Sequence, residues 1–140
     1  MTVHTLMIET AIPISMTCAD GTGIPKGTLV VLGDPMTVTA SAGDVDLIAG
    51  VTAAEKIAND GNTKVPVYRE GVFKATAGGT VTVGLSLHSY SSSGDANDLI
   101  NATASTLASE ACGIALESAS DGETFLYELC PGKATMNALA

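Results

Sequence analysis

The segment from Ile48 to Thr76 constrains the fold most, because it holds two turn signals separated by a strand pattern. Its turn cluster, Asn59-Asp60-Gly61-Asn62, combines side chains that accept local hydrogen bonds with a glycine that tolerates positive φ. In residues 64–68 (KVPVY) two valines alternate with other residues, which is the period of a strand with one buried face. Arg69-Glu70-Gly71 then reverses the chain into a second strand. The segment therefore predicts an antiparallel β unit, with Pro66 on an edge or with its amide side unpaired.

A short stretch before the turn has the composition of a helix. Residues 52–58 (TAAEKIA) contain strong helix formers, and Thr52 and Glu55 have the spacing of a capping box. Because so short a helix is not stable without packing, we expect one or two helical turns that cross between strands.

The rest of the chain consists mainly of short strand patterns between turn residues. Further strands are predicted at 14–18, 28–32, 36–40, 45–51, 81–88, 112–116 and 125–129. The polar stretch 90–98 predicts the longest loop, and residues 99–107 fit either a strand or a short helix. Residues 131–140 predict a loose tail.

A faint internal repeat indicates two similar halves. Gly50-Val51-Thr52-Ala53 and the turn 60–63 (DGNT) recur, with nearly the same spacing, as 113–116 (GIAL) and 121–124 (DGET). Chance similarity of glycine-rich turns is the alternative explanation. If the repeat is real, we expect the two halves to close on each other into one barrel.

Composition limits both the fold and the partners. A chain of 140 residues is expected to form one domain, and without tryptophan its core must be built from aliphatic side chains, as suits a small β barrel. The net charge of -9, with only 6 lysines and arginines, argues against nucleic-acid binding. No apolar run is long enough to span a bilayer, and residues 1–32 lack a signal-peptide pattern, so we expect synthesis in the cytoplasm and no membrane partner.

The three cysteines do not form a recognisable motif. Cys18, Cys112 and Cys130 are odd in number and lack CxxC spacing, so neither a disulfide framework nor a zinc site is indicated. We interpret them as free thiols, buried except for Cys130, which is expected to be the most exposed.

Candidate catalytic and ligand-binding groups are few. Ser91, His88 and Asp95 contain the residue types of a hydrolase triad, but three residues of one loop rarely converge in that geometry. No glycine-rich phosphate loop is present. We therefore predict a protein that is not an enzyme and has no cofactor.

A group of aspartates is the remaining candidate for a metal site. The residues are Asp44, Asp46, Asp95 and Asp98, and they lack the spacing of a calcium-binding loop. We interpret them as solvated acidic loop residues and predict no metal site.

The order of motifs in the central segment resembles that of the head decoration (cement) proteins of tailed viruses, of the lambda decoration protein type. The motifs are Gly50-Val51, Ala53-Ala54-Glu55-Lys56, 59–63 (NDGNT), 65–68 (VPVY) and Gly71-Val72-Phe73. The resemblance is clear over residues 48–76 and extends elsewhere only to the layout of the chain.

This resemblance implies both a fold and a function. The expected fold is mostly β: a small single-domain β barrel, β-tulip-like, with short helical crossovers and an extended N-terminal arm. The expected function is that of a non-enzymatic capsid decoration protein on the outer surface of a tailed bacteriophage head, where it stabilises the mature capsid. The implied partners are the major capsid protein and, in a homotrimer, two further copies of the chain.

The resemblance also implies a division of the chain into an arm at 1–13, a β domain at 14–130 and a tail at 131–140. The predicted capsid-binding residues of the arm are Val3, Leu6, Met7, Ile8 and Ile12. From the residues alone, this segment fits equally well as the first strand of the domain's own sheet. If it is an arm, we expect its removal to leave the domain folded.

A second function class is a ligand-binding β module of the carbohydrate-binding or adhesin type. Such modules usually stack sugars on exposed aromatic side chains. The chain has 3 tyrosines, 2 phenylalanines and no tryptophan, which argues against this alternative.

Overall fold

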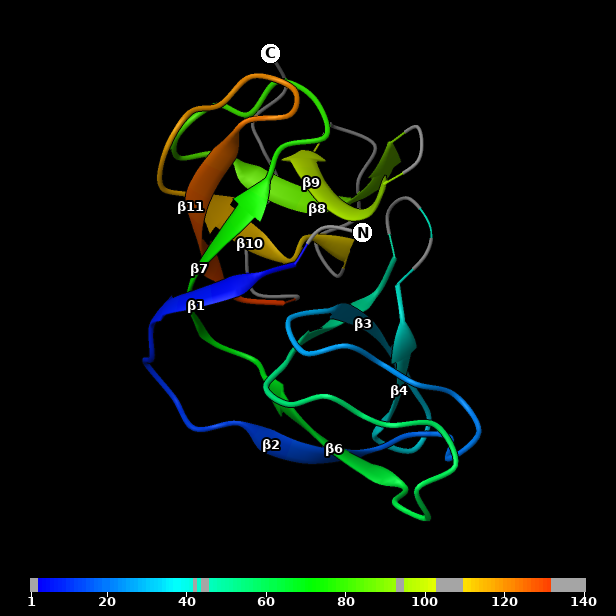
Figure 1. Ribbon diagram of the computed structural model, residues 1–140. Helices are drawn as coiled ribbons and strands as arrows, with labels where there is room; N and C mark the ends of the chain where they lie inside the picture. Colours follow the sequence, from blue (N-terminus) through cyan, green and yellow to red (C-terminus); the bar gives the residue numbers. More distant parts are fainter. Residues whose placement is uncertain (1–2, 42, 44–45, 93–94, 103–109, 132–140) are drawn as a thin grey trace.

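The computed structural model describes residues 3–41, 43, 46–92, 95–102 and 110–131, and these form a nearly all-β protein (Figure 1). The strands are β1 (Thr5–Ile8), β2 (Ile14–Thr17), β3 (Leu29–Gly33), β4 (Thr37–Ala40), β5 (Ile48–Thr52), β6 (Lys64–Tyr68), β7 (Gly71–Thr76), β8 (Ser86–Ser92), β9 (Asp95–Asn101), β10 (Gly113–Ala115) and β11 (Thr124–Leu129). The predicted fold class, a mostly β domain with a barrel, is confirmed.

The first half of the chain, β2 to β6, closes into a barrel. The strand order is β2-β4-β3-β5-β6, and β6 returns to pair with β2. A parallel pairing of Thr17 with Thr37 completes the ring between β2 and β4. Its interior is filled by small and medium apolar side chains: Met16, Cys18, Ile24, Val30, Val38, Ala49, Val65 and Val67.

The second half, β7 to β11, repeats this order of strands. Its sheet runs β7-β11-β10-β8-β9, with β1 added beside β7. An isolated parallel bridge between Ala77 and Leu99 stands where Thr17 pairs with Thr37 in the first half. Figure 1 shows the two halves as separate lobes with β1 between them.

Glycines confirm that the two halves are equivalent. A Cβ on Gly50 would lie 2.0 Å from the Tyr68 carbonyl oxygen, and one on Gly113 would lie 2.4 Å from that of Glu128. Gly61 and its counterpart Gly122 both have positive φ, at 81° and 82°. The internal repeat is therefore real, but the expected closure was wrong, because the first half buries its own core and closes alone.

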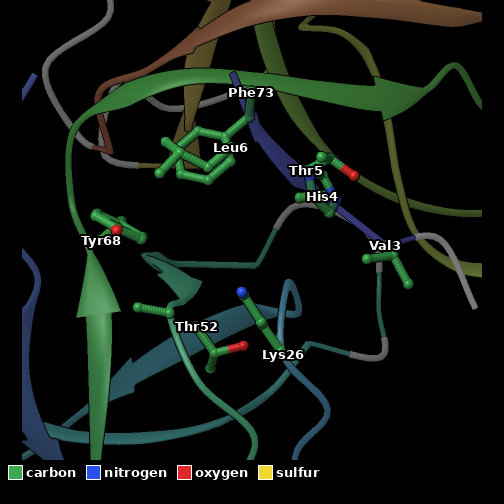
Figure 2. A pocket seen from close by; sticks show the side chains of 9 residues that line it. Val3, His4, Thr5, Leu6, Lys26, Thr52, Tyr68 and Phe73 are labelled. Atoms are coloured by element: carbon green, nitrogen blue, oxygen red, sulfur yellow. The ribbon is translucent and has the colours of Figure 1, made fainter. Parts of the chain in front are cut away.

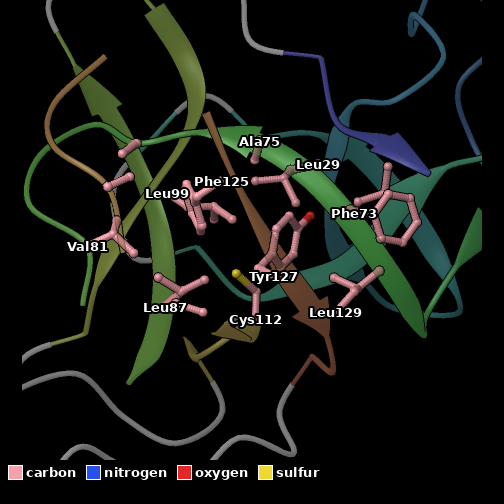
Figure 3. Close-up of a cluster of buried hydrophobic side chains, with 14 of the residues drawn as sticks. Leu29, Phe73, Ala75, Val81, Leu87, Leu99, Cys112, Phe125, Tyr127 and Leu129 are labelled. Carbon is pink, nitrogen blue, oxygen red and sulfur yellow. The ribbon is translucent and has the colours of Figure 1, made fainter. Parts of the chain in front are cut away.

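A larger core joins the halves. Leu29, Ile48 and Val51 on the first half pack in one cluster with side chains of the second half. Figure 3 shows Leu29 beside Tyr127 and Ala75. The other buried members are Phe73, Ala75, Ala77, Val81, Leu87, Leu99, Cys112, Ala115, Ala119, Phe125, Tyr127 and Leu129.

The turn after β5 is built as the sequence predicts. Gly61 has positive φ, and the Asn62 amide donates to the Asp60 side chain at 2.9 Å. Pro66 lies within the closed barrel, where its carbonyl accepts from the Ala53 amide just past the end of β5. Since the amide and carbonyl of one residue point to the same neighbour in an antiparallel pair, the proline nitrogen faces a position beyond the end of β5.

The predicted helical crossover at 52–58 was wrong. Thr52 ends β5, and Lys56 forms an isolated antiparallel bridge with Ile24. Lys56 is only 2 % exposed. Tertiary contacts of this side chain, which local helix propensity does not include, fix the segment in an irregular conformation.

The predicted loop at 90–98 was also wrong where the structure describes it. β8 and β9 form an antiparallel hairpin there, with Tyr90 opposite Asp98. Ser89, Asn97 and Asp98 are buried polar residues, so polarity along this stretch does not mark exposure. The ambiguous residues 99–101 belong to β9, whereas 103–107 and the predicted tail from 132 onward lie outside the described residues.

Candidate functional site

The N-terminal segment is the candidate for partner contact, and in the structure it is a strand of the protein's own sheet. β1 pairs antiparallel with β7, Thr5 opposite Lys74 and Leu6 opposite Phe73. β1 is the terminal strand of that sheet, so within the described residues its outer edge has no strand partner. An edge of this kind presents backbone amides and carbonyls to another chain.

Most predicted contact residues of this segment face solvent. Val3, Met7, Ile8 and Ile12 have exposed fractions of 56 %, 53 %, 58 % and 81 %. Leu6 instead packs against the larger core. The segment thus combines one anchoring side chain, Leu6, with four exposed apolar side chains, Val3, Met7, Ile8 and Ile12, whose combined surface we call the N-terminal apolar face.

His4 anchors the segment to the body of the protein. Its Nε2 lies 2.7 Å from the Asn97 carbonyl oxygen, which only accepts, so Nε2 carries the proton. Nδ1, 2.7 Å from the Tyr127 hydroxyl, therefore accepts the phenol's proton. Burial lowers the pKa of His4 from 6.5 to about 4, which keeps the ring neutral. Sequence reasoning missed this role, since one histidine in an apolar stretch carries no pattern.

Asn97, which binds His4 through its carbonyl, also connects the two halves. It lies on β9 with φ of 72°. Its side-chain oxygen accepts from the Leu29 amide, and its side-chain nitrogen donates to the Ser41 carbonyl at 2.9 Å. The polar core around His4 and Asn97 therefore fixes β1, the first half and the second half together.

A cavity of about 520 Å³ lies between β1 and the first half. Figure 2 shows Leu6 beside Phe73, with Tyr68 and Lys26 across the space. The lining residues are Val3, His4, Thr5, Leu6, Lys26, Thr52, Ala53, Tyr68 and Phe73. They include no carboxylate, so this cavity does not supply the acid–base pair of a hydrolase.

A buried ammonium fixes the long loop of the first half. Lys56 Nζ lies 3.1 Å from an Asp20 carboxylate oxygen and 2.8 Å from one of Asp60, and it also donates to the Ile57 carbonyl. Burial acts to lower the pKa of Lys56, but the hydrogen bonds to Asp60 and Asp20 raise it overall. The arrangement is a structural ion pair that holds the turn at 59–62 against the loop at Asp20.

The structure places several of the residues that were considered as catalytic or metal-binding candidates. His88 is buried and its Nδ1 donates to the Ser89 carbonyl at 2.7 Å. Asp98 is buried as well, so its interpretation as a solvated loop residue was wrong. Asp46 accepts from the Ser41 hydroxyl at 2.7 Å. Asp44 lies outside the described residues, and no group of three or more His, Cys, Asp or Glu side chains suited to a metal occurs within them.

The cysteines follow the prediction. All three are free, Cys18 and Cys112 are buried, and Cys130 is half-buried. Burial raises the pKa of the Cys112 thiol to about 12, so it remains protonated at neutral pH.

The described part of the chain also contains no helix long and apolar enough to cross a membrane.

Comparison with known proteins identifies the chain's relatives. A search of curated proteins finds no significant match. Among solved structures, the head fiber gp8.5 N base of bacteriophage phi29 is similar in fold, with a TM-score of 0.54, 15% sequence identity and coverage of 99% of this chain and 100% of that one. The family model described as phage cement protein matches residues 8–129. The chain therefore belongs to the phage cement protein family, whose role is structural and associated with the capsid.

Proposed function

We propose that this protein decorates the outer surface of a tailed bacteriophage head, binds the major capsid protein and stabilises the mature capsid. Membership of the phage cement family supports the location. The observation that carries the contact is β1, an edge strand on which the apolar side chains of Met7 and Ile8 are exposed. An edge strand of this kind adds to a strand of a partner through backbone hydrogen bonds, while its side chains fill pockets.

The proposed contact is the N-terminal apolar face, with Leu6 as its anchor. Because β1 is already paired with β7 and held by His4, its backbone is largely ordered before binding. Ordering an extended arm costs about 1 to 2 kcal/mol per residue, and a preformed strand avoids most of this cost. A free arm, in contrast, would lose this conformational entropy when it binds the capsid.

We further propose that the protein acts as a homotrimer on the capsid. A protein of this size with many exposed aliphatic side chains is expected to cover some of them by self-association. Three copies of one contact raise the effective concentration of the second and third once the first has bound. A weak contact per chain then gives firm attachment.

Co-sedimentation with expanded, undecorated capsids of the parent phage tests this function. The wild-type protein should pellet with capsids and raise the temperature at which they rupture. Replacing exposed apolar residues of the contact by aspartate, as in Met7→Asp and Ile8→Asp, should abolish both effects. Deleting the whole segment is a poorer test, since it would uncover Phe73 and Tyr127.

Leu47→Asp is the matched control, because Leu47 is exposed to a similar extent, 50 %, but lies just before β5. Its binding should equal that of the wild type. If Met7→Asp and Ile8→Asp also saturate capsids at the wild-type concentration, the contact lies elsewhere. If the wild type itself fails to bind expanded capsids, the proposed function is wrong.

A further inference from the structure

The two halves have equivalent turns that differ in what covers them. Gly27 precedes β3 and Gly84 precedes β8, with φ of 79° and 85°. Their amides donate to equivalent carbonyls, that of Thr52 at the end of β5 and that of Ala115 at the end of β10. These two turns therefore occupy the same place in each half.

In the first half this place is filled by the N-terminal segment. A Cβ on Gly27 would lie 2.7 Å from the His4 carbonyl oxygen and 2.8 Å from Val3, and the His4 amide donates to the Gly27 carbonyl at 2.8 Å. Around Gly84, no atom of the described residues lies within 4 Å of the corresponding position. The Gly84 turn is thus an open copy of a site that the chain fills elsewhere.

Side chains around the open turn are more apolar than their counterparts in the first half. Val83, Leu85 and Leu116 have exposed fractions of 54 %, 37 % and 45 %. The equivalent positions in the first half hold Lys26, Thr28 and Ala53, of which Thr28 is fully buried. We call Val83, Gly84, Leu85 and Leu116 the Gly84 face.

A second open position occurs at the other end of the molecule. Phe73 on β7 pairs with Tyr127, and its counterpart Ile14 on β2 pairs with Val67. Phe73 is 1 % exposed, since Leu6 and the Tyr68 ring, 5.8 Å away, lie against it. Ile14, in contrast, is 41 % exposed.

The Gly84 face and Ile14 correspond to the two surfaces that face each other at the junction between the two halves. Inside the molecule, Lys26, next to Gly27 on the first half, lies across the cavity from Phe73 on β7 of the second half, with Leu6 of β1 beside Phe73 (Figure 2). Within the described residues, neither the Gly84 face nor Ile14 has the neighbour that covers its counterpart. Leu85 and Leu116 are larger than their counterparts Thr28 and Ala53, so the Gly84 face offers more apolar surface than the first half does.

We propose that copies of this chain associate head to tail, with the Gly84 face of one copy packed against Ile14 and Ser15 of a second copy. We call these two residues the β2 edge, because this end of β2 pairs with β6 and β4 pairs with β2 only at Thr17. The two contacting surfaces differ, so the interface is heterologous, and rotation between successive copies decides whether a ring closes. This deepens the self-association included in the proposed function and is independent of the capsid contact.

Sedimentation velocity from micromolar to millimolar protein tests the interface with two variants. Leu116→Asp disables the Gly84 face, and Ile14→Asp disables the β2 edge. Each variant alone should associate at least about tenfold more weakly than the wild type, since a buried carboxylate replaces an apolar contact. An equimolar mixture should form a 1:1 dimer, because each variant keeps the surface that the other has lost.

Leu47→Asp is again the control and should associate like the wild type. Urea unfolding checks that each variant is folded, and Val83→Asp and Ser15→Asp serve as second variants on the two surfaces. A wild type that stays monomeric throughout the range would overturn the proposal, as would unaffected variants or a mixture that remains monomeric. Capsid co-sedimentation of the monomeric variants reports on the capsid contact separately.

Discussion

The imidazole of His4 stands edge-on to the phenol ring of Tyr127, with ring centroids 5.6 Å apart, and accepts the phenol's proton at Nδ1. These residues come from opposite ends of the chain. Their contact holds the segment that carries the N-terminal apolar face, so the proposed capsid contact depends on a neutral histidine.

Acidification should therefore destabilise the protein through His4. With a pKa of 6.5 when unfolded and about 4 when folded, His4 is neutral in both states above pH 6.5. As pH falls below 6.5 the unfolded state binds the proton first, so the free energy of unfolding drops, by roughly 3 kcal/mol at pH 4, and then levels off. Urea unfolding across this range measures the slope.

His4→Gln is the control for this pH dependence. It should be less stable than the wild type at pH 7, because the buried hydrogen bonds are changed, but it should lose the slope between pH 6.5 and 4. The lowered pKa of Asp60, caused chiefly by its hydrogen bond from Lys56, affects stability only below its ordinary value of 3.8. Parallel slopes for the two proteins would show that His4 does not titrate as described.

The positive φ at two equivalent turns predicts equal costs of substitution. Gly61→Val and Gly122→Val should each lower the free energy of unfolding by roughly 1 kcal/mol or more, from backbone strain alone, since no described residue has an atom within 4 Å of the added Cβ at either position. Asn62→Ser should be nearly silent. Equal urea midpoints for Gly61→Val and Asn62→Ser would contradict this description of the turn.

Close backbone approach predicts a much larger effect at Gly50. A Cβ there meets the Tyr68 carbonyl at 2.0 Å, so Gly50→Ala must force β5 and β6 apart. We expect most of the protein to be insoluble or unfolded. Gly84→Ala is the comparison, because its added Cβ lies more than 4 Å from every atom of the described residues, and it should stay folded by circular dichroism. A Gly50→Ala protein as stable as Gly84→Ala would refute the contact.

Removal of the buried ammonium should loosen the first half. Lys56→Met leaves Asp20, Asp60 and the Ile57 carbonyl without their shared donor, so we expect a lower melting temperature and faster amide exchange at 57–62. Lys64→Met, at an exposed lysine that donates only to the Thr17 hydroxyl, should change the melting temperature little. Similar losses for both variants would mean that the buried cluster has no special role.

The sequence by itself determined the strands and turns whose signals are local. Alternating valines in β6 and positive-φ turn residues such as Gly61 need no distant partner, so their interpretation held. The repeated glycines Gly50 and Gly113 indicated two similar halves, because each glycine is required by a close backbone contact within its own half.

The positions of the buried polar residues were decided only by the tertiary structure. A polar side chain can be buried when it has hydrogen-bond partners, and these partners can be distant in the sequence. The sequence predicted Lys56 to be a lysine on a helix, but in the structure its ammonium group binds Asp20 and Asp60. The sequence predicted Asn97 to be a loop residue, but its side chain hydrogen-bonds to Leu29 and Ser41. His4 is held by Asn97 and Tyr127, both far away in the chain. The sequence named the apolar residues of the N-terminal segment, but it left open whether they form an arm or a strand of the protein's own sheet. The tertiary contacts of His4 decided this, and no local pattern predicts them.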